Sequence, residues 1–295
     1  MKARSYYGRP VIKRPVWTPE VPIYFFFGGF AGASAGLAFA ARLTGRKKLA
    51  RVATANAFAG VAVSPPLLIS DLGVPRRFLN MLRVFKVTSP MSVGSWILSV
   101  EGGTLAVAAA HEFLGWFPRP LARFAEAIAA LFGMPLATYT AALVANTAVP
   151  VWHEGRRELP FAFAGGSAMA AGGAAAILAP AEAGPARRLA ILGAVTETVV
   201  MERSKRAMGI VSEPYSTGLA GKLERTTVAC ACGGALVLLA AEAKRSRPLT
   251  LLGSALMVGG SMCARWTVFK AGIQSAGDPK FTVSPQRERQ QRIAP

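Results

Sequence analysis

Eight apolar stretches, each long enough to cross a lipid bilayer, dominate this 295-residue sequence. About 20 apolar residues in a helix span the hydrocarbon core, so each stretch predicts a transmembrane helix. Charged residues make up only 17% of the chain, against about 25% in a soluble domain. The composition excludes disorder, collagen, a coiled coil and, with three cysteines, a disulfide scaffold. The predicted spans are Pro22–Ala41, Ala50–Ser70, Ser92–Ala110, Leu121–Val149, Phe161–Ala179, Ala186–Met201, Thr226–Ala243 and Leu249–Phe269.

Two of these spans are unusual in length. The fourth is long, so it must tilt, kink at Pro135 or leave the membrane before Val149. The sixth is short and contains Glu197; without it, the sidedness of the later loops inverts. The tryptophans lie near span ends, where indole rings favour the headgroup level. They are Trp17, Trp96, Trp116, Trp152 and Trp266.

The basic residues predict the orientation of the chain. Of the 34 lysines and arginines, 22 fall on the side that carries both termini, which places the termini in the cytoplasm of a multi-pass inner-membrane protein. Ala38-Phe39-Ala40 resembles a signal-peptide cleavage site, but the apolar run is long and basic residues follow it, so we expect a retained helix. Because the net charge of +19 is distributed in clusters between spans, nucleic-acid binding is excluded.

The histidines and cysteines argue against a cofactor held by this chain. His111 ends the third span and His153 follows the fourth, on opposite sides of the membrane, so the two cannot share a haem iron. Cys230, Cys232 and Cys263 fit no zinc or iron–sulfur spacing. We therefore expect no haem, no iron–sulfur cluster and no metal site here.

Three polar residues converge on the side of the termini. Tyr24 opens the first span, Asp71 ends the second, and Tyr139 lies late in the fourth. Two phenols and a carboxylate suit a quinone headgroup, which needs hydrogen-bond donors and a group that exchanges protons. The alternative is that the tyrosines belong to an interfacial belt and that Asp71 caps a helix or pairs with Arg76 or Arg77. Tyr139 reaches the level of Tyr24 only if the fourth span ends early.

Carboxyl groups also occur inside and at the ends of the spans. Glu101 lies near the centre of the third span, where a charge is costly. It forms either a proton path from Asp71 to the opposite face or a protonated contact to a neighbouring helix. Glu126 and Glu242 lie near span ends, and we expect them to reach the headgroups. The glycine-rich second half carries no comparable constellation and is interpreted as scaffold.

Five sequence segments occur along the chain in this order: YFFFGGFAGASAG, SDLGVPRRF, TSPMSVGSW, TYTAALVANTAVPVW and SAGDPKFTVSPQRER. Together they resemble the NrfD family, the membrane subunits of polysulfide-reductase-type complexes. The resemblance implies an all-α, polytopic membrane protein with eight transmembrane helices in two four-helix bundles, without cofactors of its own. It also implies a four-cluster ferredoxin-like iron–sulfur partner and a molybdopterin-type catalytic subunit.

The resemblance places the family's quinone pocket on Tyr24, Asp71 and Tyr139. Tyr24 stands where some relatives have histidine, and Asp71 where some have glutamate. Ala141 replaces the glycine of the family's Tyr-Thr-Gly pattern. Many relatives place this face toward the periplasm, in conflict with the count of basic residues. The partner would dock over the turn before the third span, and the docking residues expected there are Arg76, Arg77, Ser89, Pro90, Met91 and Ser92.

These inferences predict a membrane subunit of an oxidoreductase that exchanges electrons between menaquinone or ubiquinone and the iron–sulfur partner. The direction of electron flow and the terminal substrate stay open. Two alternatives are a passive membrane anchor for redox subunits and a transporter of small molecules or ions. The predicted organisation is a terminal arm (1–20), a quinone-site half (21–150), a scaffold half (151–272) and a C-terminal tail (273–295).

Overall fold

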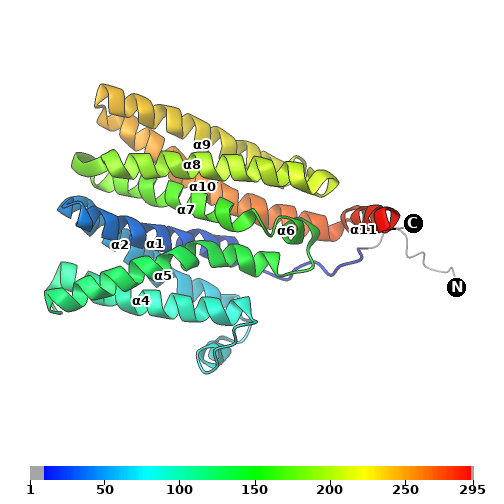
Figure 1. Cartoon of the computed structure of the whole chain (residues 1–295), viewed down its shortest axis with the longest axis horizontal. Coiled ribbons are helices and arrows are strands. Elements are labelled where there is room, and N and C mark those ends of the chain that lie inside the picture. The colour runs from blue at the N-terminus through cyan, green and yellow to red at the C-terminus, as the bar shows by residue number, and fades with distance from the viewer. Residues whose placement is uncertain (1–9, 294–295) are drawn as a thin grey trace.

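The computed structural model describes the backbone of residues 10–293 and the side chains of residues 10–287, a part of the chain that contains helices and loops but no strand. The long helices run side by side along one axis (Figure 1). The helices are α1 (Glu20–Leu43), α2 (Lys47–Ser70), η1 (Pro75–Arg77), α3 (Phe78–Met81), α4 (Pro90–Leu114), α5 (Arg119–Ala145), α6 (Pro150–Glu154), α7 (Leu159–Leu178), η2 (Pro180–Glu182), α8 (Ala183–Met208), η3 (Gly209–Tyr215), α9 (Gly218–Lys244), α10 (Arg247–Gly277) and α11 (Lys280–Ile293).

Six helices of the described chain are long and apolar enough to cross a membrane: α1, α2, α4, α5, α7 and α9. Their exposed faces carry large apolar side chains such as Phe58, Phe124 and Leu236, which suit contact with lipid. The sixth and eighth predicted spans also form helices, α8 and α10, of 26 and 31 residues. These two contain Glu197 and Arg265 and do not meet the same criterion of apolarity. The prediction of eight spans is thus supported for six.

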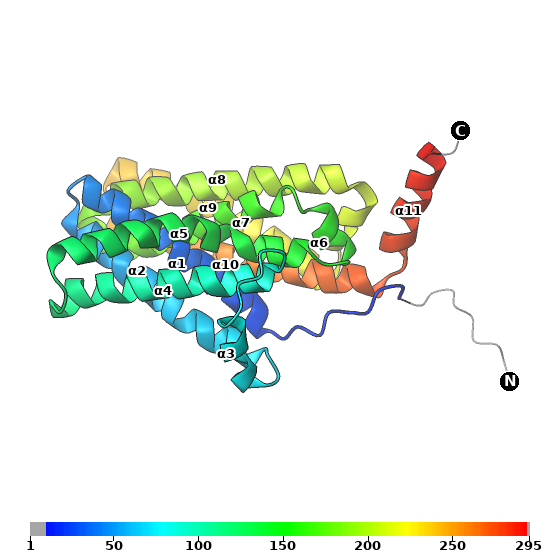
Figure 2. The ribbon, with the colours of Figure 1, turned by 60° about the horizontal axis from the view of Figure 1, so that its bottom comes forward.

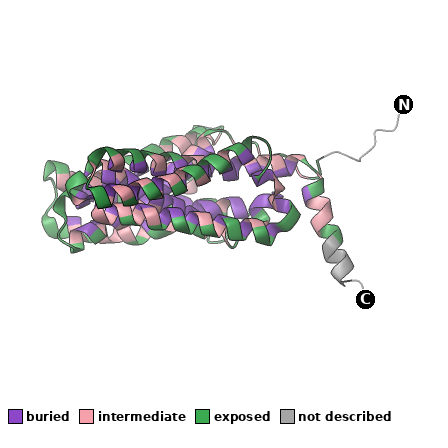
Figure 3. Cartoon of the chain, turned by 90° about the horizontal axis from the view of Figure 1, so that it is seen from above, coloured by how far each residue is buried: buried purple, intermediate pink, exposed green. Residues whose placement is uncertain are grey.

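Helix α1 lies at the centre of the molecule and packs against α2, α5 and α7. Buried residues face the neighbouring helices, and exposed residues line the outside and the helix ends (Figure 3). The approach of α1 to α5 depends on glycine. A Cβ atom on Gly133 would lie 2.5 Å from the carbonyl oxygen of Gly32, and one on Gly32 would overlap the carbonyl of Gly133. The two backbones are therefore in direct contact, as small residues allow in lipid.

The long fourth span ends early. Helix α5 stops at Ala145, a loop follows, and the chain forms the short helix α6, which the apolar pattern did not predict. Trp152 of α6 is fully buried, so its expected place in the headgroup belt is wrong. Its Nε1 donates a hydrogen bond to the carbonyl of Val268 at 2.8 Å, and its ring stacks on Trp17 with centroids 5.2 Å apart. The indole also fills the space beside Gly272 of α10.

Glu126 also departs from expectation, because it is buried at the opposite end of the bundle. The Arg42 guanidinium lies 3.2 Å from the Glu126 carboxylate and 3.0 Å from that of Glu112. Arg123 pairs with Glu126 at 2.9 Å. This cluster, which we call the Arg42 cluster, ties α1, α4 and α5 together and replaces the predicted contact of Glu126 with headgroups.

Helix α1 begins, and α10 ends, at the same end of the bundle (Figure 1). The segment before α1 runs along that end, and α11 projects from it (Figure 2). Arg265, which lies inside the eighth predicted span, is fully buried within α10. The orientation of this end toward the cytoplasm stays a prediction.

We predict that Gly32→Ala destabilises the protein, because the added methyl group must separate α1 from α5. Overpacking of this kind costs about 1–3 kcal/mol, measurable as a lower midpoint of thermal unfolding in detergent. Gly36→Ala is the matched control on the same helix, since nothing lies within 4 Å of its added Cβ. That variant should be neutral or more stable by about 0.5–1 kcal/mol. Equal midpoints for the two variants would contradict the close contact.

Candidate functional site

Tyr24 and Tyr139 meet at the end of the bundle where α1 begins and α5 ends. Their rings lie edge to face, with centroids 6.4 Å apart and an interplanar angle of 66°. They share a level because α5 ends six residues after Tyr139, about 9 Å along a helix. Tyr24 is 2% exposed and Tyr139 9%. Within the described chain the buried Tyr24 hydroxyl has no hydrogen-bond partner.

Gly94 of α4 provides the space that the Tyr139 ring occupies. A Cβ atom at Gly94 would overlap the Cε2, Cδ2 and Cζ atoms of that ring. The glycine in the segment SPMSVGSW therefore has a local physical reason: it lets a phenol lie flat against the helix backbone. Helix α4 thus holds Tyr139 in place between α1 and the loop before α4.

Asp71 lies close to Tyr24 but is engaged with the segment before α1. It is half-buried at the C-terminal end of α2. Its Oδ1 accepts hydrogen bonds from the Thr18 hydroxyl at 2.8 Å and from the Thr18 backbone N–H at 3.3 Å. Among the described residues Asp71 forms no ion pair with Arg76 or Arg77. Tyr24 and Asp71 both line a narrow pocket of about 30 Å³.

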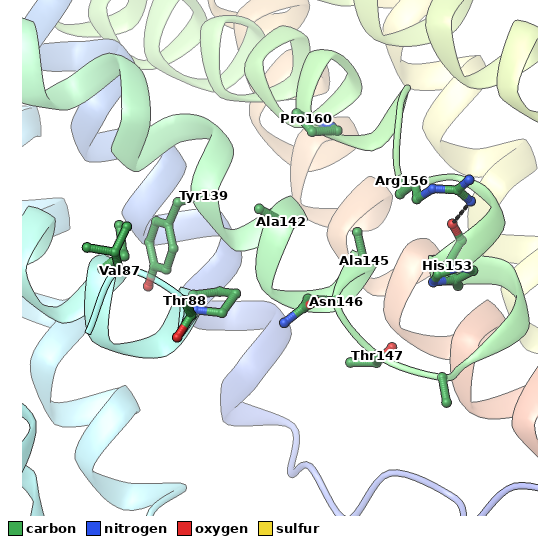
Figure 4. A pocket seen from close by; sticks show the side chains of 13 residues that line it. Val87, Thr88, Tyr139, Ala142, Ala145, Asn146, Thr147, His153, Arg156 and Pro160 are labelled. Carbon is green, nitrogen blue, oxygen red and sulfur yellow. Dashed lines mark hydrogen bonds between the residues drawn. The ribbon is translucent and has the colours of Figure 1, made fainter.

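Tyr139 lines a separate and much larger cavity of about 880 Å³. Figure 4 shows that residues of the loop before α4, the end of α5, α6 and the start of α7 line this open cavity. Its wall is mostly apolar, and polar groups come from Tyr139, Thr88, Asn146, His153 and Arg156. The three residues predicted to bind quinone thus lie at one end of the bundle. They line two different pockets, because Tyr24 and Asp71 face the narrow one and Tyr139 the large one. The contact between the two tyrosine rings lies between these pockets.

The sequence patterns did not predict three of the residues that line this cavity, His153, Asn146 and Arg156. His153 was weighed only as a haem ligand, Asn146 lay inside the predicted fourth span, and Arg156 followed that span. In the structure Arg156 donates from Nη1 to the His153 carbonyl at 3.0 Å, which closes the α6 turn beside the cavity. The signal that could have found them is the Asn-Thr-Ala-Val-Pro segment, a combination of turn formers that breaks the helix before Trp152.

Glu101 lies in the middle of α4 with its carboxyl group buried. Neither carboxyl oxygen has a hydrogen-bond partner among the described residues. The predicted hydrogen bond from Glu101 to a neighbouring helix is not formed here.

The residues predicted to dock a partner surround the start of α4. Arg76 and Arg77 are exposed on η1, in the loop region that projects from the side of the bundle (Figure 2). Ser89 caps α4 by accepting a hydrogen bond from the Ser92 N–H at 3.4 Å, and the Ser92 hydroxyl donates to the Val84 carbonyl at 3.1 Å. The two hydroxyls thus shape the loop. Pro90 lines the large cavity and Met91 the narrow pocket.

These features define a multi-pass helical membrane protein with a phenol-lined cavity at the end where α1 begins. A family model described as "Polysulphide reductase, NrfD" matches residues 11–188, more than half of the chain. The chain belongs to the NrfD family. No curated protein matches it.

We predict that Gly94→Ala destabilises the protein through Tyr139 in particular. The added methyl group must displace the ring, at a cost of about 1–3 kcal/mol, seen as a lower unfolding midpoint. In a Tyr139→Ala background the same substitution should cost much less, because the obstructing ring is gone. Gly103→Ala, with nothing within 4 Å of its added Cβ, is the control on α4. A cost that is identical in both backgrounds would contradict the contact.

Proposed function

We propose that the protein is the quinone-interacting membrane subunit of a redox complex. It would exchange electrons between menaquinone or ubiquinone and an iron–sulfur partner subunit. Membership of the NrfD family is consistent with such a subunit. The observation that carries the proposal is the position of Tyr139, which lines the 880 Å³ cavity while its ring packs against the buried Tyr24.

The large cavity suits a quinone headgroup in size and chemistry. Ligand sites of about 300–1,000 Å³, mostly apolar with a few polar groups, are typical for small molecules. The Tyr139 hydroxyl, the Thr88 hydroxyl and the Asn146 amide can donate hydrogen bonds to quinone oxygens. His153 adds an imidazole, which can donate or accept a hydrogen bond. Tyr24 packs against the Tyr139 ring and places a second phenol next to it.

Asp71 and Glu101 support proton exchange at this end of the bundle. Asp71 is half-exposed, so its carboxylate can exchange protons with water, and it shares a pocket with Tyr24. Glu101 lies in the middle of α4, and its buried carboxyl oxygens have no hydrogen-bond partner among the described residues. The order Asp71, Tyr24, Glu101 would form the first part of a path from the quinone site into the bundle.

The iron–sulfur partner would dock where the loop between α2 and α4 projects beside the cavity. Arg76 and Arg77 are exposed there, and their charges suit an acidic protein surface. A passive anchor would bind the same partner without quinone. Quinone extracted with the purified complex, and displaced by a headgroup inhibitor, would distinguish the redox role from the anchor.

We predict that Tyr139→Phe lowers quinol turnover in the purified complex. Loss of one hydrogen bond of about 1.4 kcal/mol to the reacting oxygen corresponds to about tenfold in rate. Tyr215→Phe is the matched control, because Tyr215 is also buried with an unpartnered hydroxyl but lies in η3 and lines neither pocket. Equal turnover of the two variants would contradict the assignment of Tyr139.

We also predict that Asp71→Asn and Glu101→Gln uncouple proton exchange from the quinone site. Each substitution keeps the size of the side chain but removes its ability to take up a proton. Quinol turnover and proton uptake, measured together in liposomes, should fall in both variants, whereas the exposed Asp278→Asn serves as the control. If Glu101→Gln leaves both quantities unchanged, no path runs through Glu101.

A further inference from the structure

The second half of the chain, predicted to be scaffold, contains a cavity of about 240 Å³ that several charged side chains line. Helices α7, α8, α9 and α10 enclose it. Its wall includes five ionisable side chains: Glu197, Glu202 and Lys205 from α8, Glu224 from α9 and Arg265 from α10. All five follow residue 188, beyond the segment that the family model matches.

Arg265 forms the inner end of this cavity and is held on several sides. Its Nη2 donates to the Phe163 carbonyl at 2.6 Å and to the Ser167 hydroxyl at 3.1 Å. The guanidinium carbon lies 4.1 Å from the centroid of the Phe163 ring, a cation–π contact. Its Nε has no partner among the described residues. Such a buried, immobilised cation in a membrane helix marks a functional site more often than a structural one.

Glu197 approaches Arg265 because two glycines of α7 leave room. A Cβ atom on Gly165 would lie 2.7 Å from the backbone nitrogen of Glu197, so α8 lies directly on α7 at this level. A Cβ atom on Gly166 would lie 2.6 Å from Glu197 Oε1 and 3.1 Å from Arg265 Nη2. Both charged groups thus converge over the same glycine. The glycine pair that the sequence pattern assigned to packing therefore also makes space for a carboxyl group.

Two ion pairs of Lys205 lie between this inner end and the surface, and the exposure of their side chains increases toward the surface. Lys205 pairs with Glu224 at 2.9 Å and with Glu202 at 3.1 Å. The side chains of Glu202, Lys205 and Glu224 are 48%, 25% and 10% exposed, whereas Glu197 is buried. These ion pairs lie toward the end of the bundle where α8 ends and α9 begins, the end that also carries the Tyr139 cavity (Figure 1).

We propose that this cavity is a proton-exchange site, in which the Glu197 carboxyl takes up and releases a proton through water that enters past Lys205 and Glu224. Only an O–H bond forms or breaks in this step, and no electron moves. The cavity is large enough for several water molecules. Polar atoms without hydrogen-bond partners in the described chain, Glu197 Oε2 and Thr227 Oγ1, are available to such water.

The arrangement of charges favours a proton over a metal ion. Lys205 already neutralises Glu224 and Glu202, and Glu197 is the carboxyl of this cavity for which the described residues provide no ion pair. A metal ion of the calcium type needs six or more oxygen ligands, but one carboxyl suffices for a proton. The charged groups that face Glu197 are Arg265 from α10, Glu224 from α9 and the two α8 residues; α7 contributes no ionisable side chain.

The site adjoins the first half of the protein through Arg265. Phe163, which carries the guanidinium on its face, contacts Phe25 of α1 with ring centroids 5.9 Å apart. Phe25 is the neighbour of Tyr24. Arg265 and Phe163 thus form a chain of contacts from the cavity to the helix that carries Tyr24. The exchange itself does not depend on quinone, so it can be tested separately from the proposed function.

The test uses infrared spectra of the full-length chain in lipid nanodiscs during exchange from H₂O into D₂O. We expect the wild type to show a carboxylic-acid C=O band that shifts to lower frequency on deuteration. Glu197→Gln, which preserves side-chain size, should lose one component of that band. Glu242→Gln, at the exposed end of α9, should retain it. An unchanged exchangeable band in Glu197→Gln would overturn the proposal.

A second variant tests the route of water and does not require any change at Glu197. Thr227→Leu adds apolar volume to the cavity and removes an unpartnered hydroxyl. The band should remain in this variant but exchange more slowly than in the wild type. Exchange as fast as in the wild type would overturn the proposed entry of water, including in the case that Glu197→Gln does not fold.

Discussion

Direct contact between helix backbones, made possible by glycine, is the constraint on which this structure depends. In a bilayer there is no hydrophobic drive between helices, so close packing must supply the attraction. The Gly32–Gly133 contact brings α1 against α5, and Gly165 brings α8 against α7. At two further positions the absence of a side chain on glycine makes room for a polar or aromatic group. Gly94 accommodates a tyrosine ring and Gly166 a carboxyl group beside a guanidinium. Packing and polar chemistry thus use the same residues.

The absence of water in a bilayer explains why polar side chains are grouped as they are. A polar group buried without a partner costs free energy, so it is paired or faces a cavity. The Trp152 indole and the Arg265 guanidinium both bond to backbone carbonyls. Tyr24, Glu101 and Glu197 instead keep oxygen atoms without partners in the described chain. Glu197 lines the cavity to which we assign proton exchange, and Tyr24 packs against Tyr139 beside the proposed quinone site.

Apolar length predicted the positions of the long helices well, because a span is determined by a local run of residues. The end of α5 at Ala145 and the burial of Trp152 were not predictable in this way, since both depend on contacts with α10 and with the segment around Trp17. Tyr24, Asp71 and Tyr139 could be placed at one end from their order in the spans. Their division between two pockets could not, because it depends on the path of the loop around α6. Arg265 was visible as a charge within the eighth predicted span, but its bonds to α7 depend on tertiary contacts that the sequence does not show.

The Arg42 cluster has a mechanical consequence for the opposite end of the bundle. It joins α1, α4 and α5 by ion pairs where α1 ends. The three helices therefore share a pivot at the end of the bundle opposite to Tyr24 and Tyr139. A helix of 24 residues is about 36 Å long, and a tilt of about 3° around such a pivot displaces its free tip by about 2 Å. A small tilt at the Arg42 cluster therefore corresponds to a larger displacement at the other end of the bundle, where we propose that a quinone enters.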